Sequence, residues 1–427
     1  MKTSKKQTSA SLKKNMEKLA GKARDACRVL ASLDSKKKNE VLCAMGSALL
    51  DHMGLILEAN RKDVEAAQKK RLSKSFIERL TLDERRICEM AESLGEVSKL
   101  DDPVGVPIKA WARPNGLQIS KVRVPIGVIL VIYEARPNVT SDCAGLCFKS
   151  GNAVILKGGS DAIRSNEAIF NVLQREIVRA GLPSGTISFV ETADRRAVDV
   201  LLQMDRYINL VMPRGGESLI REVRDKSRIP VIKHYKGVCH IFVDASADVA
   251  MAKNIVMNAK VQRPSVCNAV ETLLVHQDIA EGFLPMMVQA LQDAGVEVRG
   301  CSRTRRVMPN IRRAVEADWY AEYLDLILSV KVVKDVREAI DHINHYGSSH
   351  SDAIVTQDQQ NAELFLKDVD SACVYVNAST RFTDGYQFGL GAEIGISTDR
   401  LHARGPMGLE ELTTYKYVIR GTGQVRE

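Results

Sequence analysis

Short apolar segments alternate with helical segments along most of the chain after residue 125. The apolar segments have the length of strands, and the stretches between them follow a helical period. Strands joined through helices run parallel, with helices on both faces of the sheet. The pattern predicts an α/β chain with two doubly wound parallel sheets, an arrangement that binds nucleotides at its strand ends. The expected strands are residues 128–133, 153–157, 187–190, 208–212 and 238–243 in the first block and 269–275, 327–333, 353–356 and 373–377 in the second.

The segments outside these blocks predict helices and a separate group of strands. Residues 12–98 contain good helix formers and few glycines, and residues 81–84 read as a capping box led by Thr81. Residues 108–124 alternate around a Pro-Asn-Gly turn, which predicts a hairpin. The segment 412–419 alternates in the same way without a strand nearby in the sequence. We expect it to pair with the hairpin and to form an edge suited to oligomerisation.

Composition narrows the class of protein. The 427 residues are 45% hydrophobic and 27% charged, which is ordinary for a globular protein. There is no apolar run long enough for a membrane span, and the N-terminus lacks the apolar core of a secretory signal. The nine cysteines include no CxxC pair, which is typical of a reducing compartment. We therefore expect a cytoplasmic protein of two or three domains without a membrane segment.

The positive charge is concentrated at one end of the chain. The formal net charge is +8, and residues 1–16 contain five lysines and no acidic residue. The rest of the chain is therefore nearly balanced, which is not the pattern of a nucleic-acid-binding surface. We interpret residues 1–16 as a flexible basic tail and expect no nucleic-acid partner.

Cys267 lies in the stretch from Gln262 to Val275, where a helix is followed by a loop and a strand. Ser246 is placed to cap that helix, and Pro264 cannot continue it. Cys267 is therefore expected in a tight loop, whose free N–H groups can stabilise the oxyanion formed when a thiolate attacks an acyl carbon. A lone cysteine among apolar residues is more often part of a core, so the local pattern leaves both interpretations open.

Two glycine turns follow expected strands of the first block. One is Lys157-Gly158-Gly159-Ser160, and the other contains Gly215 and Gly216 and leads into a helix. Glycines at such turns let the backbone approach an anion at a helix N-terminus. Neither turn is a GxGxxG fingerprint or a P-loop, and a Gly-Gly pair is also common in plain tight turns.

Several longer blocks give the chain a family resemblance. Residues 339–354 are similar to the signature of the gamma-glutamyl phosphate reductase family, within the aldehyde dehydrogenase superfamily. The resemblance covers residues 12–420, and the supporting blocks are residues 134–140, 262–272, 376–385 and 402–408. The resemblance implies an aldehyde dehydrogenase-like fold, with two doubly wound parallel-sheet domains and a small β oligomerisation element.

The resemblance also implies an activity and a set of site residues. It implies NADPH-dependent reduction of L-glutamyl 5-phosphate to L-glutamate 5-semialdehyde with release of phosphate, in proline biosynthesis. Cys267 matches the family's nucleophile, which would form a thioester, and Asn138 matches the asparagine whose amide completes the oxyanion hole. The residues implied for NADPH/NADP binding are Lys157, Ser160, Gly215, Gly216 and Glu322.

One departure from the superfamily is informative. Hydrolytic members carry a glutamate base before the nucleophile, and residues 232–238 contain none. An acyl-phosphate reductase does not need to activate water, because phosphate is already a good leaving group. Substrate anions call for arginine, and Arg136, Arg381 and Arg404 lie in the family-like blocks, with Arg381 preferred. Surface ion pairing is the alternative for each arginine.

The histidines were considered both as metal ligands and as partners of Cys267 in a different mechanism. His342, His345 and His350 do not have zinc-ligand spacing, so we expect them to be structural or to bond near the site, and we expect no metal. A thiol hydrolase using Cys267 with His234 or His240 is the rival enzyme. A non-catalytic, RNA-binding relative is the rival from another class.

These inferences define the expected domains and partners. Besides a small-molecule substrate, we expect a homo-oligomer, either a dimer or a tetramer, and the resemblance suggests glutamate 5-kinase as a further partner. The expected parts are a flexible tail (1–16), an NADP-binding domain (17–107 and 125–244), oligomerisation strands (108–124 and 410–420) and a catalytic domain (245–409).

Overall fold

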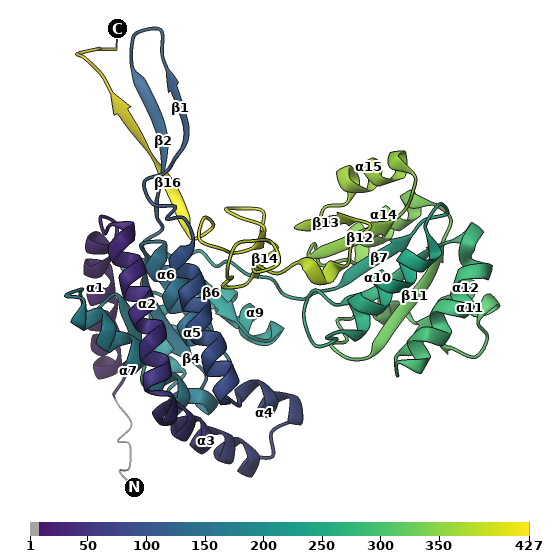
Figure 1. Cartoon of the computed structure of the whole chain (residues 1–427), viewed down its shortest axis with the longest axis horizontal. Helices are drawn as coiled ribbons and strands as arrows, with labels where there is room; N and C mark the ends of the chain where they lie inside the picture. The colour runs from purple at the N-terminus through teal and green to yellow at the C-terminus, as the bar shows by residue number, and fades with distance from the viewer. Residues whose placement is uncertain (1–7, 427) are drawn as a thin grey trace. The chain divides into compact units, whose positions relative to one another are not determined.

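The computed structural model describes residues 8–426 and divides into two compact units. Unit 1 holds the described residues up to Lys233, together with Gly389–Gly395 and the residues from Met407 onward. Unit 2 holds His234–Phe388 and Ile396–Pro406. Each unit contains its own parallel sheet (Figure 1).

Unit 1 begins with helices, as predicted for residues 12–98. In the first helix Leu12, Met16 and Ala20 lie on one buried face. Residues 9–16 are therefore part of a packed helix, and the prediction of a flexible tail is wrong for them. Residues 1–7 of the predicted tail lie outside the described part of the chain. The capping-box prediction is also wrong, because Asp83 rather than Thr81 caps the fifth helix, where its side chain accepts the N–H of Arg86. The helices are α1 (Ser9–Leu30), α2 (Ser35–Asp51), α3 (Met53–Lys69), α4 (Lys74–Leu80) and α5 (Glu84–Lys99).

The first parallel sheet lies in unit 1 in the order β5-β4-β3-β6. Its central strand β3 is buried along its whole length, which explains the continuous apolar run in the sequence. The strands are β3 (Val128–Tyr133), β4 (Ala153–Gly158), β5 (Ile187–Phe189) and β6 (Leu210–Arg214). The connecting elements are α6 (Val139–Lys149), η1 (Ser160–Ala162), α7 (Ile163–Arg179), α8 (Arg196–Leu201) and α9 (Glu217–Lys226).

A separate three-stranded antiparallel sheet confirms the predicted pairing of the hairpin with the terminal strand. Its order is β1-β2-β16, with β1 (Pro107–Ala112), β2 (Gln118–Pro125) and β16 (Thr413–Arg420). Strand β16 pairs with β2 from Thr413 opposite Pro125 to Arg420 opposite Gln118. Figure 1 shows the three strands lying side by side, and Tyr415, Tyr417 and Ile419 are exposed on them. The role of this sheet in oligomerisation stays a prediction.

Unit 2 contains a seven-stranded parallel sheet in the order β10-β9-β11-β8-β7-β12-β13. One face packs against α10 and α11 and the other against α14 and α15, so the predicted doubly wound α/β class is confirmed. The strands are β7 (Cys239–Val243), β8 (Val270–His276), β9 (Glu297–Gly300), β10 (Arg312–Arg313), β11 (Ile327–Val333), β12 (Ser351–Val355) and β13 (Cys373–Val376). The helices are α10 (Val249–Val261), α11 (Gln277–Asp293), α12 (Ser302–Val307), α13 (Glu316–Trp319), α14 (Val336–Tyr346) and α15 (Gln359–Asp368), and the short elements are η2 (Thr380–Phe382), β14 (Ile396–Ser397) and β15 (Gly405–Pro406).

The structure moves one expected domain boundary. We placed residues 238–243 at the end of the first block, but β7 pairs with β8 and β12 in unit 2. The boundary therefore lies after Lys233 rather than after residue 244. The cap of α10 is also corrected, because Asp248 rather than Ser246 accepts the N–H of Met251.

The described helices were compared in length and hydrophobicity with the thickness of a bilayer. No single one is long and apolar enough to cross a bilayer, and α2 and α3 meet that test of length and composition only as a pair bent by 66°.

Candidate active site

Cys267 lies in the loop between α10 and β8, as the sequence predicted, and is partly exposed. Three other cysteines have the alternative environment, a buried position in the core. Cys143, Cys147 and Cys239 are fully buried, and burial raises the pKa of each thiol well above its usual value. A raised pKa keeps a thiol protonated and unreactive. Cys267 differs from these three in its exposure, so it is not part of the packed core.

The loop of Cys267 is held against the segment that leads into β7. The Sγ of Cys239 donates to the carbonyl oxygen of Cys267 at 3.2 Å. Gly237 passes so close that a Cβ atom added there would lie 1.8 Å from the same oxygen. Only glycine therefore allows this approach of the two backbones.

Asn268 fixes the next residue of the loop. Its Nδ2 donates to the carbonyl of Thr383 at 2.8 Å, and the hydroxyl of Thr380 donates to the carbonyl of Asn268 at 2.7 Å. The guanidinium of Arg381 donates to Asn268 Oδ1 and, through Nε, to Gln262 Oε1 at 3.1 Å. The loop of Cys267 is thus anchored to the 380–383 segment through side chains.

Arg381, the preferred substrate arginine, interacts with groups of both signs. Burial lowers its pKa and the nearby charge of Arg263 lowers it further, whereas its interactions with Cys267 and Asp384 oppose this shift. Arg263 is exposed and belongs to the loop of Cys267. Two adjacent guanidinium groups favour an anion between or beside them. We did not single out Arg263 from the sequence, although its place four residues before Cys267 was a usable signal.

Glu322 lies in the turn before β11 and contacts the same region. Its Oε1 accepts the N–H of Gly237 at 2.8 Å. One oxygen of the carboxylate proposed for cofactor binding therefore already supports the backbone beside Cys267.

The other arginine candidates differ from each other. Arg404 donates through Nη1 to the carboxylate of Asp370 at 2.8 Å and through Nη2 to the carbonyl of the same residue, while its buried Nε has no hydrogen-bond partner among the described residues. Its role in substrate binding stays a prediction. Arg136 is exposed and lies in the segment between β3 and α6.

Histidines of unit 2 have structural partners. His240 is fully buried and its Nδ1 lies 2.9 Å from Asp352, while His234 Nδ1 lies 3.0 Å from the carbonyl of Ile396. Burial lowers the pKa of His342 to about 2, with help from His240 and Lys331. Within residues 8–426, no cluster of three or more His, Cys, Asp or Glu side chains has the arrangement of a metal site.

In unit 1, Asn138 stands directly before α6 and is exposed. Its Nδ2 donates to Asp142 Oδ2 at 2.9 Å. Burial raises the pKa of Asp142 to about 6, although the bond from Asn138 and the charge of Arg214 oppose this shift. The amide is therefore oriented by a helix-borne carboxyl group.

The two glycine turns of unit 1 lie where the sequence placed them, at the carboxyl ends of β4 and β6. Lys157 is nearly buried and donates to the carbonyl of Gly158 at 2.8 Å; burial, and next the charge of Arg195, lower its pKa. Ser160 is exposed and opens η1.

At the second turn, Gly216 precedes α9 and its N–H donates to Glu134 Oε2 at 3.0 Å. A Cβ at Gly215 would lie 2.6 Å from Glu134 Cδ. This helix N-terminus thus already binds an anionic group, which fits it to a dinucleotide phosphate. Glu134 was within a family-like block, but nothing in the sequence indicated this contact.

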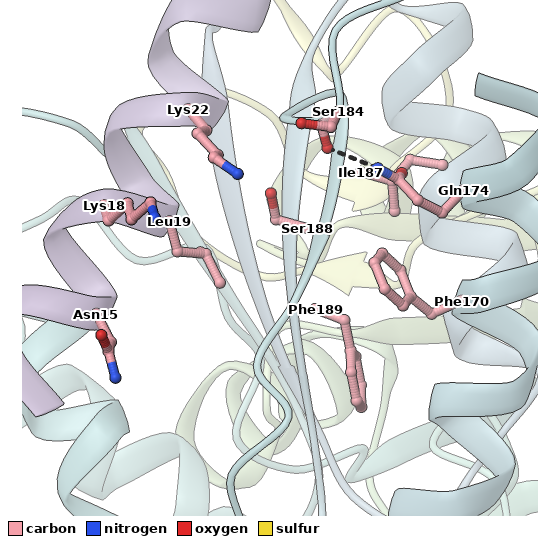
Figure 2. A pocket seen from close by; sticks show the side chains of 10 residues that line it. All are labelled: Asn15, Lys18, Leu19, Lys22, Phe170, Gln174, Ser184, Ile187, Ser188 and Phe189. Carbon is pink, nitrogen blue, oxygen red and sulfur yellow. Dashed lines mark hydrogen bonds between the residues drawn. The ribbon is translucent and has the colours of Figure 1, made fainter. Parts of the chain in front are cut away.

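A shallow cavity of about 250 Å³ lies elsewhere in unit 1, between α1, α7 and the edge strand β5 (Figure 2). Lys18 and Lys22 of α1 face a stacked pair of rings, Phe170 and Phe189, across it. None of the predicted site residues lines this cavity. Its volume is below the range of roughly 300–1,000 Å³ usual for ligand pockets, so we assign no ligand to it.

Comparison with known proteins defines the class of the chain. The chain belongs to the aldehyde dehydrogenase family, whose model matches residues 3–325. The crystal structure of an acetylating aldehyde dehydrogenase from Geobacillus thermoglucosidasius shows the same fold, with 16% identity, a TM-score of 0.69 and coverage of 99% of this chain and 100% of that one.

Closer relatives define the family within that class. The gamma-glutamyl phosphate reductase of Caldanaerobacter subterraneus is 58% identical over 96% of this chain and 100% of its own length. The crystal structure of gamma-glutamyl phosphate reductase from Thermotoga maritima has a TM-score of 0.95 and 49% identity, covering 96% of this chain and 100% of that one. The chain therefore belongs to the gamma-glutamyl phosphate reductase family, as the resemblance indicated.

Proposed function

We propose that this chain reduces L-glutamyl 5-phosphate to L-glutamate 5-semialdehyde with NADPH and releases phosphate, as a step of proline biosynthesis. The observation that carries the proposal is the 58% identity with a gamma-glutamyl phosphate reductase over 96% of the chain. The partly exposed Cys267, on a loop anchored by several side chains, supports a covalent mechanism.

In the proposed reaction the Cys267 thiolate attacks the γ-carbonyl carbon and forms a C–S bond. The C–O bond to phosphate then breaks, and phosphate leaves with its electron pair, so a thioester remains. The proposal assigns oxyanion stabilisation to the backbone N–H of Cys267 and to the amide of Asn138. After reduction the C–S bond breaks, the sulfur regains its electron pair, and the aldehyde is released. The absence of glutamate from residues 232–238 supports a reaction in which water is not activated.

NADPH supplies the hydride when it is bound. The residues proposed to hold it are Lys157, Ser160, Gly215, Gly216 and Glu322. The N–H of Gly216 suits a phosphate because it stands at the positive end of α9 and already donates to a carboxylate. The preference for NADPH over NADH is part of the proposal.

For the substrate anions we propose Arg381 and its neighbour Arg263. Their mutual repulsion, which contributes to the lowered pKa of Arg381, would be relieved by a bound phosphate or carboxylate. Arg136 remains a proposed contact, and Arg404 would first have to leave Asp370.

We further propose that the chain forms a dimer or tetramer through the β1-β2-β16 sheet, because that sheet exposes Tyr415, Tyr417 and Ile419. The nine free cysteines support a reducing, cytoplasmic location.

The reverse reaction tests the proposed function. Purified protein is given L-glutamate 5-semialdehyde, phosphate and NADP, and NADPH absorbance is recorded. We expect NADPH to form only when phosphate is present, and Cys267→Ser to abolish its formation while NADPH binding and the melting temperature are retained. Cys301→Ser is the matched control, because Cys301 is also a free, partly exposed cysteine of unit 2. NADPH formation without phosphate, or full activity of Cys267→Ser, contradicts the proposal.

A further inference from the structure

A buried ion pair closes the base of the nucleophile loop. Lys260 belongs to the last turn of α10 and Glu271 is the second residue of β8, so the two residues flank the loop that carries Cys267. Both side chains have no exposed surface, and Lys260 Nζ lies 2.6 Å from Glu271 Oε2. Neither residue has a part in the proposed chemistry.

The second oxygen of Glu271 reaches another element. Its Oε1 accepts the N–H of Leu324 at 3.2 Å. Leu324 has a φ angle of +53°, in the left-handed region that a leucine rarely adopts. The strained turn therefore depends on contacts from outside itself, and Glu271 supplies one of them.

This turn presents Glu322. Glu322 Oε1 accepts the N–H of Gly237, and Gly237 packs against the carbonyl of Cys267. A chain of contacts thus begins at Glu271, which binds the N–H of Leu324 in the turn of Glu322. It continues from Glu322 to Gly237 and ends at the Cys267 loop, which Glu271 itself flanks. A shift of the Glu271 carboxylate would move both the carboxylate of Glu322 and the backbone beside the nucleophile.

Stability alone does not account for a buried pair of this kind. Removing charges from water is costly, and an apolar pair of similar size often stabilises a protein equally well. Burial raises the pKa of Glu271 to about 7, against the opposing effect of Lys260, and burial also lowers the pKa of Lys260. The pair therefore carries a desolvation cost, while its geometry satisfies the N–H of Leu324.

We propose that Glu271, fixed by Lys260, is a positioning residue that holds the 322–324 turn and thereby sets the place of Glu322. This inference rests on the proposed role of Glu322 in NADPH binding. It adds that the loop of the nucleophile and the turn of Glu322 are set by one shared carboxylate.

Two double variants distinguish the role of Glu271 as a hydrogen-bond acceptor for Leu324 from the role of its charge in the ion pair with Lys260. In Lys260→Met/Glu271→Gln both charges are removed, but a side-chain oxygen can still accept from Leu324. In Lys260→Met/Glu271→Leu the oxygen is removed as well. Since apolar replacement of a buried pair is often tolerated, we expect both variants to melt close to the wild type.

The variants should differ in NADPH affinity and in backbone protection. We expect the Leu variant to bind NADPH about fivefold more weakly, the effect of losing one hydrogen bond, and the Gln variant to bind it normally. The amide of Gly237 should exchange its hydrogen about fivefold faster in the Leu variant and at the wild-type rate in the Gln variant. Fluorescence titration and hydrogen exchange measure the two effects.

The chain offers a matched control pair. Lys38 and Asp102 lie 2.7 Å apart, Lys38 is fully buried, and Asp102 Oδ1 accepts the N–H of Val104 at 3.0 Å. Lys38→Met/Asp102→Leu should change neither NADPH affinity nor the exchange of Gly237.

Equal behaviour of the Leu and Gln variants in both measurements overturns the inference. If the wild type fails to bind NADPH, the proposed function fails, and the exchange of Gly237 still decides the role of Glu271. If the Leu variant does not fold, Lys260→Met/Glu271→Met takes its place, because methionine also lacks a strong acceptor and adapts its shape.

Discussion

The candidate residues of the two units lie at opposite ends of their parallel strands. In unit 1, the turns with Lys157 and Gly216 follow β4 and β6, so they lie at carboxyl ends. In unit 2, Gly237, Cys267 and Glu322 precede β7, β8 and β11, so they lie at amino ends. The unit 1 turns can use the positive N-terminus of a following helix, whereas the Cys267 loop follows the negative C-terminus of α10. A thiolate there would need another positive charge, and Arg381, which interacts electrostatically with Cys267, can supply one.

The two regions also differ in how firmly they are held. The Gly216 turn has a single exposed carboxylate, Glu134, on its N–H, and a Cβ at Gly216 would meet no atom within 4 Å. The Cys267 loop is fixed through Asn268, Cys239 and the contact with Gly237. The Gly216 turn therefore fits our proposal of an exchangeable anion site, and the Cys267 loop fits our proposal of a prebuilt nucleophile loop.

The largest expected effect tests the prebuilt loop. Gly237→Ala places a Cβ 1.8 Å from the carbonyl oxygen of Cys267, so the loop must move. We expect a loss of about 3 kcal/mol in the free energy of unfolding, the upper range for overpacking. The displaced thiol should lower the rate about hundredfold. Denaturant unfolding and steady-state kinetics measure both.

Gly216→Ala is the matched control, and its free energy of unfolding should change by only about 0.5 kcal/mol, a small cost for alanine at a helix N-cap. Equal effects of the two substitutions would contradict the distinction between the regions.

The next largest effect tests whether a side chain of unit 1, Asn138, is also held in a fixed orientation for catalysis. Asn138→Ala removes the amide that Asp142 orients. We expect a rate loss on the order of 10²–10³, the usual cost of losing one oxyanion donor. Ser141→Ala is a control, because its hydroxyl donates only to the carbonyl of Asn138 at 2.8 Å. A wild-type rate for Asn138→Ala, measured under saturating substrate, would remove this residue from the site.

A smaller effect tests the exchangeable anion site. Glu134 occupies the N–H of Gly216, where we propose a cofactor phosphate. Glu134→Gln keeps the shape and removes the competing charge, so NADPH should bind about threefold more tightly, the effect of one charge at a helix terminus. Glu167→Gln, an exposed glutamate of α7, is the control for net charge. Unchanged or weaker NADPH binding in Glu134→Gln would show that this carboxylate does not compete.

The smallest effect concerns pH. The folded-state pKa of Asp142 is about 6, above its usual value of 3.8. The folded state therefore holds this proton more tightly than the unfolded chain does. The stability contributed by the protonated form is present below pH 3.8 and is lost as pH rises through about 6. Asp142→Asn should flatten this part of the stability profile, as measured by denaturant unfolding between these two pH values, and a profile identical to that of the wild type would contradict the shift.

Sequence patterns predicted the elements whose signals are local. The buried strands of the two blocks and the helices of residues 12–98 were predicted correctly, because their apolar period and turn residues specify them. The pairing of β16 with the hairpin was also correct, but it was inferred because neither segment had another partner strand nearby in the sequence. The assignment of β7 to the first block was wrong, because a buried strand does not reveal which sheet it joins. The short strands β9 and β10 were missed for lack of length.

The features of the candidate site also divide into those with a local sequence signal and those without one. The place of Cys267 in a loop between a helix and a strand was predicted correctly, because a proline, a cysteine and an apolar strand follow one another in the sequence. Its role as the nucleophile was implied only by the family resemblance and stays a prediction. The contacts that anchor it join residues far apart in the chain, such as Asn268 to Thr383 and Gly237 to Glu322. Side-chain bonds between distant segments leave no periodic trace, so sequence reasoning did not find them.

The pairing of β16 with β2 has a consequence for protein synthesis. Strand β2 ends at Pro125, but its partner begins only at Thr413. During translation the outer edge of β2 stays without its partner until nearly all of the chain has left the ribosome. A nascent chain of this length therefore exposes an open strand edge for most of its elongation, the period in which holdase chaperones would shield it from edge-to-edge aggregation.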